Sequence, residues 1–501
     1  MDRRRFLHTL LAGGAALALA PRARALDGND APSFARARAE RPWLAGWSSV
    51  DPASFAPAQA TLEGRLPKDL AGTLYRNGPA LFERAGLRYR HWFDGDGLLR
   101  AWRIGGGAVE HRARMVQTSK FVREQAAGRF LLPAAGTTIP DALPVRNNDD
   151  VNPANTSVVR IGTRLLALWE GGSAIEVEPG ELATRGPVTW RPELAALPFS
   201  AHPLFERDGS AWNFGSLDLI GASGLLVWRV AADGRTANAT PIRTPQPGYL
   251  HSFAMTERHL VFVLAPYRRE GEGAFFERLR FAADQPALVA VVPKDAPDAP
   301  RWLEADFGAV YHFGDAFERG REIVVHAVRH HDLAEMRAPM AAAMRGEAGG
   351  GASRQAVLSA LRIDLDRGRA RWHDTEVRGI EFPTFDAPAA RAGSARLYAP
   401  MRTAAAAAPY FDAVAAIDAR RGRAEVHAYG PDVLAEEHLF VPRPGRRRAG
   451  EGWLVGTLLD ARRGRSGLVV LDAERVGDGP LAQAWLPRTM PLGFHGAFVP
   501  A

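Results

Sequence analysis

Four histidines stand in apolar, strand-like stretches close to turns, where an imidazole could serve as a metal ligand. They are His202 in FSAHPLF, His251 in GYLHSFAMT, His312 in AVYHFGDAFE and His495 in PLGFHGAFVP. None has the short spacing of a local metal motif such as His-x3-His, so each one alone is more simply read as a hydrogen-bonded core histidine. The chain has no Cys, so any metal ion must be held by His, Asp or Glu.

Other polar motifs are explained without a metal or a nucleotide. His330 and His331 lie in a polar run, and His373 and His427 lie on expected outer hairpins. Asp, Gly, Asp and Gly at 94–97 resemble the start of a calcium loop, but the remaining oxygen ligands and the final Glu are missing. We interpret that stretch as a tight turn. The glycine-rich stretches GGGAVE and GGGAS lack the strand-to-helix setting of a phosphate loop.

A repeated strand pattern predicts the elements that position these histidines. An apolar strand, a polar turn with Asp, Gly or Pro, and a second strand recur at 98–116, 175–190, 227–242, 287–303, 361–372, 414–427 and 468–485. The repeats begin about 50 to 75 residues apart, which is room for roughly four strands, the content of a propeller blade. The predicted fold class is therefore all-β, a β-propeller of about seven blades. A β-sandwich with further domains is the alternative.

Two segments interrupt the blade pattern, at 267–283 and 331–350, and are predicted to form a helical or irregular cap over the propeller axis. Methionine adapts to irregular apolar ligands, so a Met stripe on the second segment could line a substrate site, although such a stripe is more often core packing. No compositional break suggests a second domain, and residues 26–501 are predicted to be one unit. The candidate substrate residues in the cap are Phe275, Phe276, Met336 and Met340.

A set of ordered motifs gives the chain a resemblance to the carotenoid cleavage oxygenase family. They are GTLYRNGPALF, RHWFDGDGLLRAW, NPANTSVV, LLALWEGG, HSFAMT, YHFGDAFE, EFPTFD, FVPRPG and GFHG, spread from residue 71 to residue 496. The resemblance implies a seven-bladed propeller with iron(II) held on the axis by His202, His251, His312 and His495. It also implies oxidative cleavage of a carbon–carbon double bond in an apolar polyene by O2. Asp315 stands where family members usually carry Asn.

The same resemblance implies a carboxylate partner for three of the histidines. Glu170 in LALWEGG, Glu381 in EFPTFD and Glu437 in EEHLFVPRPG would accept hydrogen bonds from His251, His312 and His495 respectively. Such outer carboxylates fix the tautomer and the orientation of a ligating imidazole. Glu436 competes with Glu437 for the last role, but the spacing before VPRPG favours Glu437.

Trp169 bears on the class of substrate. Stilbene-cleaving members of the family carry a Lys immediately before the first supporting Glu, and this chain has Trp169 in that position. An indole suits a long polyene and offers no positive charge to a phenolate. We therefore expect carotenoid or apocarotenoid cleavage. The alternatives are stilbene-type cleavage, a retinoid-type isomerase on the same iron site, and a metal-free propeller that only binds an apolar ligand.

The N-terminus predicts export. Arg3, Arg4 and Arg5 precede Phe6 and Leu7, and a short apolar run and an Ala-Arg-Ala stretch complete a pattern that resembles a twin-arginine signal over residues 1–25. Those residues hold five Arg and one Asp, so the formal net charge of +7 falls to +3 without them. Such a balance gives no case for nucleic-acid binding, and no protein partner is indicated.

The expected location is the periplasm, and the expected substrate resides in membranes. An exported enzyme must then extract the substrate from a bilayer, so we predict peripheral membrane contact through the cap. Five cap arginines are expected to meet anionic headgroups, namely Arg268, Arg269, Arg278, Arg280 and Arg337.

Overall fold

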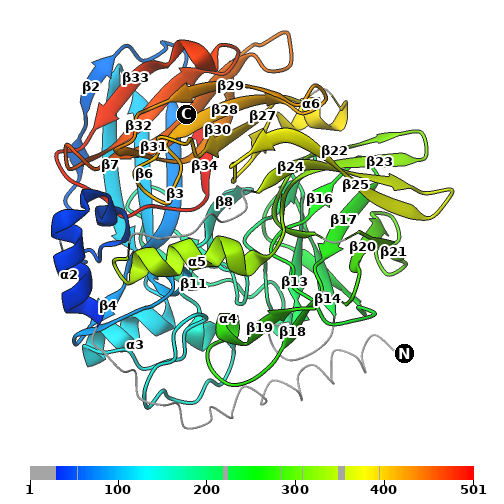
Figure 1. Cartoon of the computed structure of the whole chain (residues 1–501), viewed down its shortest axis with the longest axis horizontal. Helices are drawn as coiled ribbons and strands as arrows, with labels where there is room; N and C mark the ends of the chain where they lie inside the picture. Colours follow the sequence, from blue (N-terminus) through cyan, green and yellow to red (C-terminus); the bar gives the residue numbers. More distant parts are fainter. Residues whose placement is uncertain are drawn as a thin grey trace.

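The structure is a computed structural model that describes residues 30–501 except 54, 218–223, 283, 307, 348–355 and 394. The expected export signal at 1–25 and the last three residues of the second cap segment lie outside the described residues. Most of the regular structure is β-strand, and Figure 1 shows the sheets following one another around the molecule in sequence order, with the C-terminal strand β34 beside strands from the N-terminal part.

Within the described ranges the strands form seven antiparallel units of four or five strands, and each unit is one blade. From the axis outward, blade 1 contains β34 (Gly496–Pro500), β3 (Gly72–Leu81), β6 (Asp96–Gly105), β7 (Ala108–Met115) and β1 (Ala58–Gln59). Blade 2 contains β8 (Ser157–Ile161), β9 (Arg164–Leu168), β10 (Ile175–Val177) and β11 (Thr184–Pro187). Blade 3 contains β12 (Leu204–Phe205), β13 (Ala211–Ser216), β14 (Leu225–Val230) and β15 (Ala237–Ile242).

Blades 4 and 5 share one continuous sheet, because a single parallel bridge between Ala305 and Ala370 joins their outer edges. Blade 4 contains β16 (Ala254–Met255), β17 (His259–Leu264), β20 (Ala287–Pro293) and β21 (Arg301–Ala305), and blade 5 contains β22 (Ala309–Arg319), β23 (Glu322–His330), β24 (Val357–Asp364) and β25 (Arg369–Arg378). Blade 6 contains β26 (Thr384–Phe385), β27 (Leu397–Met401), β28 (Ala413–Asp418) and β29 (Arg423–Ala428). Blade 7 contains β30 (Val433–Pro442), β31 (Gly452–Asp460), β32 (Arg465–Asp472), β33 (Pro480–Trp485) and β2 (Thr61–Gly64).

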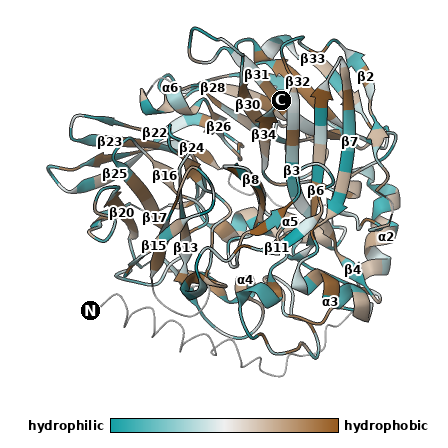
Figure 2. Cartoon of the chain, turned by 180° about the vertical axis from the view of Figure 1, so that it is seen from behind, coloured by the Kyte–Doolittle hydropathy of each residue, from teal (hydrophilic) through white to brown (hydrophobic). Residues whose placement is uncertain are grey.

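A hydrophobic core lies between each pair of neighbouring blades, which confirms a ring of seven. Val291 of blade 4 and Ile323 of blade 5 belong to one such core. Trp102 of blade 1 and Val470 of blade 7 belong to the core that closes the ring. The other five inter-blade cores complete the circuit. Figure 2 shows the hydrophobic segments in the interior strands and hydrophilic segments at the hairpin ends.

The seven hairpins expected from the sequence are confirmed, and each joins the third and fourth strands of one blade, counted from the axis. Their turns explain why the pattern is strong. At the β24–β25 turn the Asp364 carboxylate accepts hydrogen bonds from the backbone N–H groups of Asp366 and Arg367. Gly368 then adopts a left-handed φ of 64°, which only glycine takes without strain.

The cap over the axis is larger than the two segments expected from the sequence. The first expected segment forms the hairpin β18 (Tyr267–Arg269) and β19 (Leu279–Phe281) with the single helical turn α4 (Phe275–Arg278) at its tip. The second forms α5 (Leu333–Met344), which crosses the middle of the view in Figure 1. A third segment between blades 1 and 2 was missed, with α3 (Ser119–Ala127) and η3 (Asn148–Val151). Outside these two short helices its backbone is irregular and has no period that a sequence could reveal.

The apolar stripe of helix α5 both packs in the core and lines a cavity. Leu333 and Met344 are fully buried in two cores beneath the cap, whereas Met336 and Met340 are half-buried and line a cavity. Arg337 was expected to meet anionic headgroups, and that expectation is wrong, because the side chain is buried with its guanidinium 5.1 Å from the centre of the Phe276 ring.

The remaining helices of the described residues are α2 (Asp30–Glu40), η1 (Pro42–Trp47), η2 (Trp92–Asp94), η4 (Pro192–Leu194), α6 (Ala387–Arg391) and η6 (Val476–Asp478), and β4 (Glu83–Arg84) and β5 (Leu87–Arg88) form a small hairpin. In the part of the chain that the structure describes, every helix is too short or too polar to cross a bilayer.

Candidate metal centre

The four histidines named from the sequence lie in, or just before, the innermost strands of four blades. His202 and His251 lie in the segments that enter β12 and β16, and His495 immediately precedes β34. His312 lies within β22, where the pairing with β23 shifts register between Val310 and Phe313. A bulge of this kind turns a strand residue away from its neighbours, here toward the axis. Because innermost strands converge on the axis, side chains far apart in sequence meet there.

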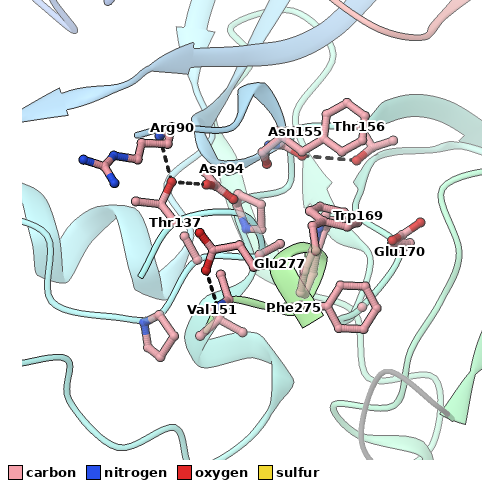
Figure 3. Close-up of a pocket in the computed structure, with 18 of the residues that line it drawn as sticks. Arg90, Asp94, Thr137, Val151, Asn155, Thr156, Trp169, Glu170, Phe275 and Glu277 are labelled. Carbon is pink, nitrogen blue, oxygen red and sulfur yellow. Dashed lines mark hydrogen bonds between the residues drawn. The ribbon is translucent and has the colours of Figure 1, made fainter. Parts of the chain in front are cut away.

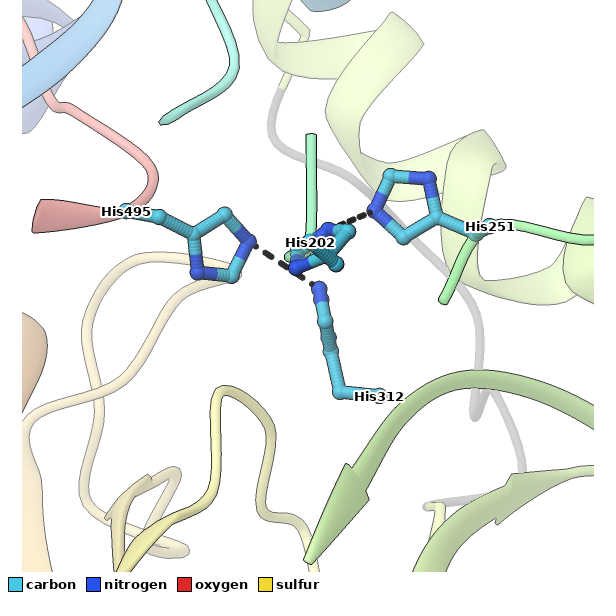
Figure 4. Close-up of side chains that lie close together, drawn as sticks. All are labelled: His202, His251, His312 and His495. Atoms are coloured by element: carbon cyan, nitrogen blue, oxygen red, sulfur yellow. Dashed lines mark hydrogen bonds between the residues drawn. The ribbon is translucent and has the colours of Figure 1, made fainter. Parts of the chain in front are cut away.

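The imidazole rings point toward one another (Figure 4). The Nε2 atoms of His202 and His251 are 2.9 Å apart, and those of His312 and His495 are 3.1 Å apart. One ring nitrogen from each of the four lies within 4.8 Å of the others. This is the only group of three or more His, Asp or Glu among the described residues that could hold a metal ion in this way.

Three of the four rings turn their other nitrogen to a carboxylate. The Nδ1 atom of His251 lies 2.7 Å from Glu170, that of His312 lies 2.5 Å from Glu381, and that of His495 lies 2.8 Å from Glu437. A carboxylate acceptor keeps the proton on Nδ1, so the Nε2 lone pair faces inward, as a metal ligand requires. The three glutamates come from blades 2, 6 and 7, so each of the seven blades contributes one group to the centre.

Each supporting carboxylate is held by a different outer group that the sequence reading did not assign. The Tyr249 hydroxyl donates to Glu170, the buried His330 ring pairs with Glu381, and the Arg76 guanidinium donates to Glu437 at 2.6 Å. His330 lies in a polar run of the sequence and was given no role at the site, whereas the structure places it buried against Glu381. A signal was present for Arg76, which is a charged residue inside the apolar run GTLYRNGPALF and is completely buried.

Strand β30 explains why Glu437 rather than Glu436 reaches His495. Its pairing with β31 shifts register between Ala435 and His438, so that two successive glutamates both point inward. Glu436 accepts two hydrogen bonds from Arg100, at 2.8 and 3.2 Å, and one from the Gly493 N–H. Glu436 therefore anchors the neighbouring backbone, and Glu437 orients the ring.

The electrostatics of the centre suit a cation. Burial and the other three rings hold the pKa of His202 well below its usual value, and burial lowers the pKa of His312 to about 4 despite the nearby Glu381. Burial alone would raise the pKa of Glu381, but His312 and His330 outweigh it, and the net pKa is lowered. These shifts favour the neutral imidazole at His202 and His312 and the ionised carboxylate at Glu381.

The donor set fits a divalent transition metal. Four neutral imidazoles suit ions such as iron, zinc or copper, and the structure places no thiolate or carboxylate atom among the converging nitrogens of the described residues. The three supporting carboxylates and the Arg76 guanidinium carry a formal charge of −2 between them, which a divalent cation would balance. Glu436 and Arg100 form an ion pair whose formal charges sum to zero.

The departure from the family pattern at Asp315 is accommodated locally. Its carboxylate is buried and lies 2.5 Å from Nδ1 of His326 on the neighbouring strand β23. The charged side chain therefore has a hydrogen-bond partner and does not reach the four rings.

A large cavity opens on the centre from the cap side. Its volume is about 1410 Å³, and His251, His312 and His495 form part of its wall. Figure 3 shows Trp169 and Phe275 beside Glu170 in this wall. All five candidate substrate residues line it, namely Trp169, Phe275, Phe276, Met336 and Met340, and further aromatic wall comes from Phe93, Phe382, Phe411 and Phe494.

One carboxylate holds the third cap segment against the propeller. Asp94, in the stretch interpreted as a tight turn, accepts a hydrogen bond from the Thr137 hydroxyl at 2.6 Å (Figure 3). It also accepts one from the Gly136 N–H at 2.8 Å. Thr137 in turn accepts from the Arg90 N–H. Burial raises the pKa of Asp94 to about 6, so its ionised form is costly in this wall.

Known proteins share this architecture. Residues 51–500 match the family model described as retinal pigment epithelial membrane protein, RPE65. Apocarotenoid-15,15'-oxygenase of Synechocystis sp. is 29% identical over 491 residues, which cover 92% of this chain and 97% of that protein. Carotenoid 9,10(9',10')-cleavage dioxygenase 1 of Pisum sativum is also 29% identical, over 91% of this chain and 90% of its own length. Isoeugenol monooxygenase of Pseudomonas nitroreducens is 27% identical, over 88% and 94%.

A solved structure of cobalt-substituted Synechocystis ACO superposes with a TM-score of 0.81 at 27% identity, covering 92% of this chain and 99% of that one. The family match spans all seven blades and the four histidines that meet on their axis. The chain therefore belongs to the retinal pigment epithelial membrane protein family, the carotenoid cleavage oxygenase family that its sequence motifs resemble.

Proposed function

We propose that this protein is a non-haem iron(II) dioxygenase that cleaves a carbon–carbon double bond of a carotenoid or apocarotenoid, using O2, to aldehyde or ketone products. The observation that carries the proposal is a set of four converging imidazoles at the end of an apolar cavity of about 1410 Å³. Relatives of similar identity are an apocarotenoid oxygenase and a carotenoid cleavage dioxygenase, which act on substrates that such a cavity suits.

Iron is the metal that best fits this chemistry. Bound iron would supply the redox centre that lets ground-state dioxygen react with a closed-shell polyene. His202, His251, His312 and His495 would hold it through Nε2, and their neutral character leaves the full divalent charge on the ion. A related solved structure contains substituted cobalt, which supports a transition-metal site of this kind.

The cavity wall supplies binding and exclusion of water. Phe382 stacks on His312 with ring centres 4.9 Å apart and lies at the same distance from His495, so an apolar surface borders the ligand set. Aromatic side chains such as Trp169 and Phe494 bury the flat face of a polyene at little conformational cost. A dry site also protects a reactive substrate from side reactions with water.

A phenolic substrate is less well supported, although isoeugenol monooxygenase is among the relatives. Trp169 occupies the position where stilbene-cleaving members carry Lys. The lysine that does border the cavity, Lys120, is buried and engaged by Asp96 at 2.7 Å and Glu124 at 2.9 Å. The Tyr89 hydroxyl accepts the third hydrogen bond of this ammonium at 2.9 Å, so the charge is already balanced and no donor is free for a phenolate.

Product analysis tests the proposal. Purified, iron-loaded protein is incubated with carotenoids, apocarotenals, a hydroxystilbene and a retinyl ester under ¹⁸O2. We expect labelled aldehydes from a carotenoid or apocarotenoid. Cleavage of the stilbene alone would establish the phenolic alternative, and an unlabelled geometric isomer would establish isomerase activity.

We also propose that the protein is exported to the periplasm by the twin-arginine route. The support is the Arg-Arg-x-Phe-Leu order within residues 1–25. Because this route carries folded proteins, iron would be inserted before export. Changing Arg3 and Arg4 together to Lys should retain the precursor in the cytoplasm, and normal periplasmic accumulation would contradict the route.

Peripheral membrane contact through the cap is proposed as the way in which the substrate enters. Arg269 and Arg280 of the β18–β19 hairpin are exposed, and each cation near an anionic bilayer contributes about 1 kcal/mol. Phe276 is buried and cannot insert without rearrangement. The double variant Arg269→Glu with Arg280→Glu should weaken binding to anionic liposomes while keeping its metal, and unchanged binding would exclude this surface.

A further inference from the structure

A second, smaller cavity reaches the same four-histidine centre. Its volume is about 190 Å³, and its wall includes His202, His312 and His495. Pockets for drug-sized ligands usually measure about 300–1,000 Å³, so this one is too small for a polyene. The main cavity borders His251 but not His202, so the two cavities approach the centre from different directions.

Strand direction places the two cavities on opposite sides of the ligand ring. In blade 5 Tyr311 and His312 face the main cavity, whereas His312, Phe313 and Gly314 face the small one. Blade 4 repeats the order, with Tyr249 on the main side and the residues from Ser252 onward on the other. Along each of these inner segments the chain passes from the cap side, through the ligand, to the rear. We call the smaller space the rear cavity.

Phe382 stands between the two cavities and lines both. Its φ of 51° is left-handed, which is costly for a bulky residue, so the surrounding structure must hold it there. The preceding Glu381 side chain accepts from the Phe382 N–H at 3.0 Å. The same carboxylate that orients His312 thus fixes the residue that divides the two spaces.

The rear wall is mainly apolar, and its outer end is covered. Besides Phe382, six large apolar side chains contribute to it, namely Leu204, Phe205, Phe253, Met255, Phe313 and Phe385. The polar part of the wall is Ser252, Arg391 and, beside the histidines, Glu437. Helix α6 covers the outer end, where Arg391 donates a hydrogen bond to the Phe205 carbonyl and lies 3.7 Å from Glu206. The charge of Arg391 is directed at these partners on blade 3, so the interior keeps its apolar character.

We propose that the rear cavity holds and delivers dioxygen. This inference rests on the proposed oxygenase function. A rigid polyene in the main cavity would obstruct the cap-side approach to the centre, whereas the rear cavity would stay free of the polyene. Dioxygen is small and apolar, and cavities with apolar walls tend to exclude water and to accept such guests.

Xenon, an apolar atom that crystallography detects directly, tests the binding site without turnover. In crystals of the wild-type protein pressurised with xenon, we expect a peak among Leu204, Phe253 and Phe385. A rear cavity filled with ordered water, or xenon in the main cavity alone, would overturn the proposal. The result stands whether or not the protein cleaves a carotenoid, so it is separable from the test of the proposed function.

A variant that obstructs the rear cavity tests whether O2 reaches the centre through it. Ala387 is exposed at the start of α6 and lines the rear cavity, so Ala387→Trp should obstruct it from outside. We expect a severalfold rise in KM for O2, with KM for the polyene, kcat at saturating O2 and metal content unchanged. Ala392→Trp is the matched control, because Ala392 is exposed just beyond α6 and does not line the cavity.

Wild-type KM for O2 in Ala387→Trp, with the indole seen in the rear cavity, would refute the route. Met255→Phe narrows the same space from a half-buried position on β16 and replaces the first variant if that one does not fold.

Discussion

Replacing Glu437 by Gln tests two effects of this carboxylate, on the orientation of the His495 ring and on the stability of the fold. The carboxylate accepts from Nδ1 of His495 at 2.8 Å, from Arg76 at 2.6 Å and from the Gly496 N–H at 2.9 Å. A glutamine can keep one acceptor but turns an NH2 group toward the remaining donors. A charge-assisted bond worth about 1.5–3 kcal/mol becomes a neutral one of about 0.5–1.5 kcal/mol, so the His495 ring is held less firmly.

The expected loss of metal affinity is roughly 10- to 100-fold, the usual effect of removing an outer carboxylate, which corresponds to about 1.4–2.7 kcal/mol. Stability falls as well, because Arg76 is completely buried and would keep only Glu436, 3.8 Å away, as its anionic partner. Breaking such a buried pair costs up to roughly 3–5 kcal/mol. Chelator competition measures the first effect and denaturant unfolding of the metal-free protein measures the second.

Glu436→Gln is the control for this pair of effects. Glu436 is as deeply buried and binds Arg100, yet it has no hydrogen bond to any of the four histidines. It should lose comparable stability while keeping metal affinity within a few-fold of wild type. Equal loss of metal affinity in both variants would refute the claim that Glu437 acts through His495.

The outer strands could be predicted from the sequence, and the inner strands could not. Hairpins such as 361–372 alternate in hydrophobicity and carry an Asp and a Gly that determine the turn locally. Strands β12, β16 and β26 have two residues each, too few to show any period, and they border the metal centre. The position of the ligands therefore depends on ring closure, a long-range property that local patterns do not encode.

The centre itself was predictable only through the family resemblance. Each histidine alone is ambiguous, since buried histidines with hydrogen-bond partners are common. Tyr249, His330 and Arg76 were missed for a physical reason: each acts through a carboxylate from another blade, and no spacing in the sequence records that contact. Polar residues inside buried strands, such as His330 at the end of β23, were the available signal.

Three further predictions address the metal ligands, the cavity wall and the Asp94 carboxylate that binds the third cap segment. His251→Ala or His495→Ala should abolish activity and sharply lower metal content by elemental analysis, and full occupancy in both would contradict the ligand assignment. Trp169→Lys should shift cleavage toward a hydroxystilbene in a two-substrate competition, because it adds a cation beside the centre, and an unchanged product ratio would show that this position does not select substrate. Asp94→Asn should flatten the pH dependence of stability between about pH 4 and pH 6. Because burial raises the pKa of Asp94 from an ordinary 3.8 to about 6, its contribution is fully present below pH 3.8 and is lost as pH rises through 6. The shift of about two units limits that loss to about 3 kcal/mol, and Lys120, whose charge opposes the shift, is unchanged in the variant. Denaturant unfolding of both proteins across this range measures the difference, and parallel stability curves would show that folding does not raise the pKa of Asp94.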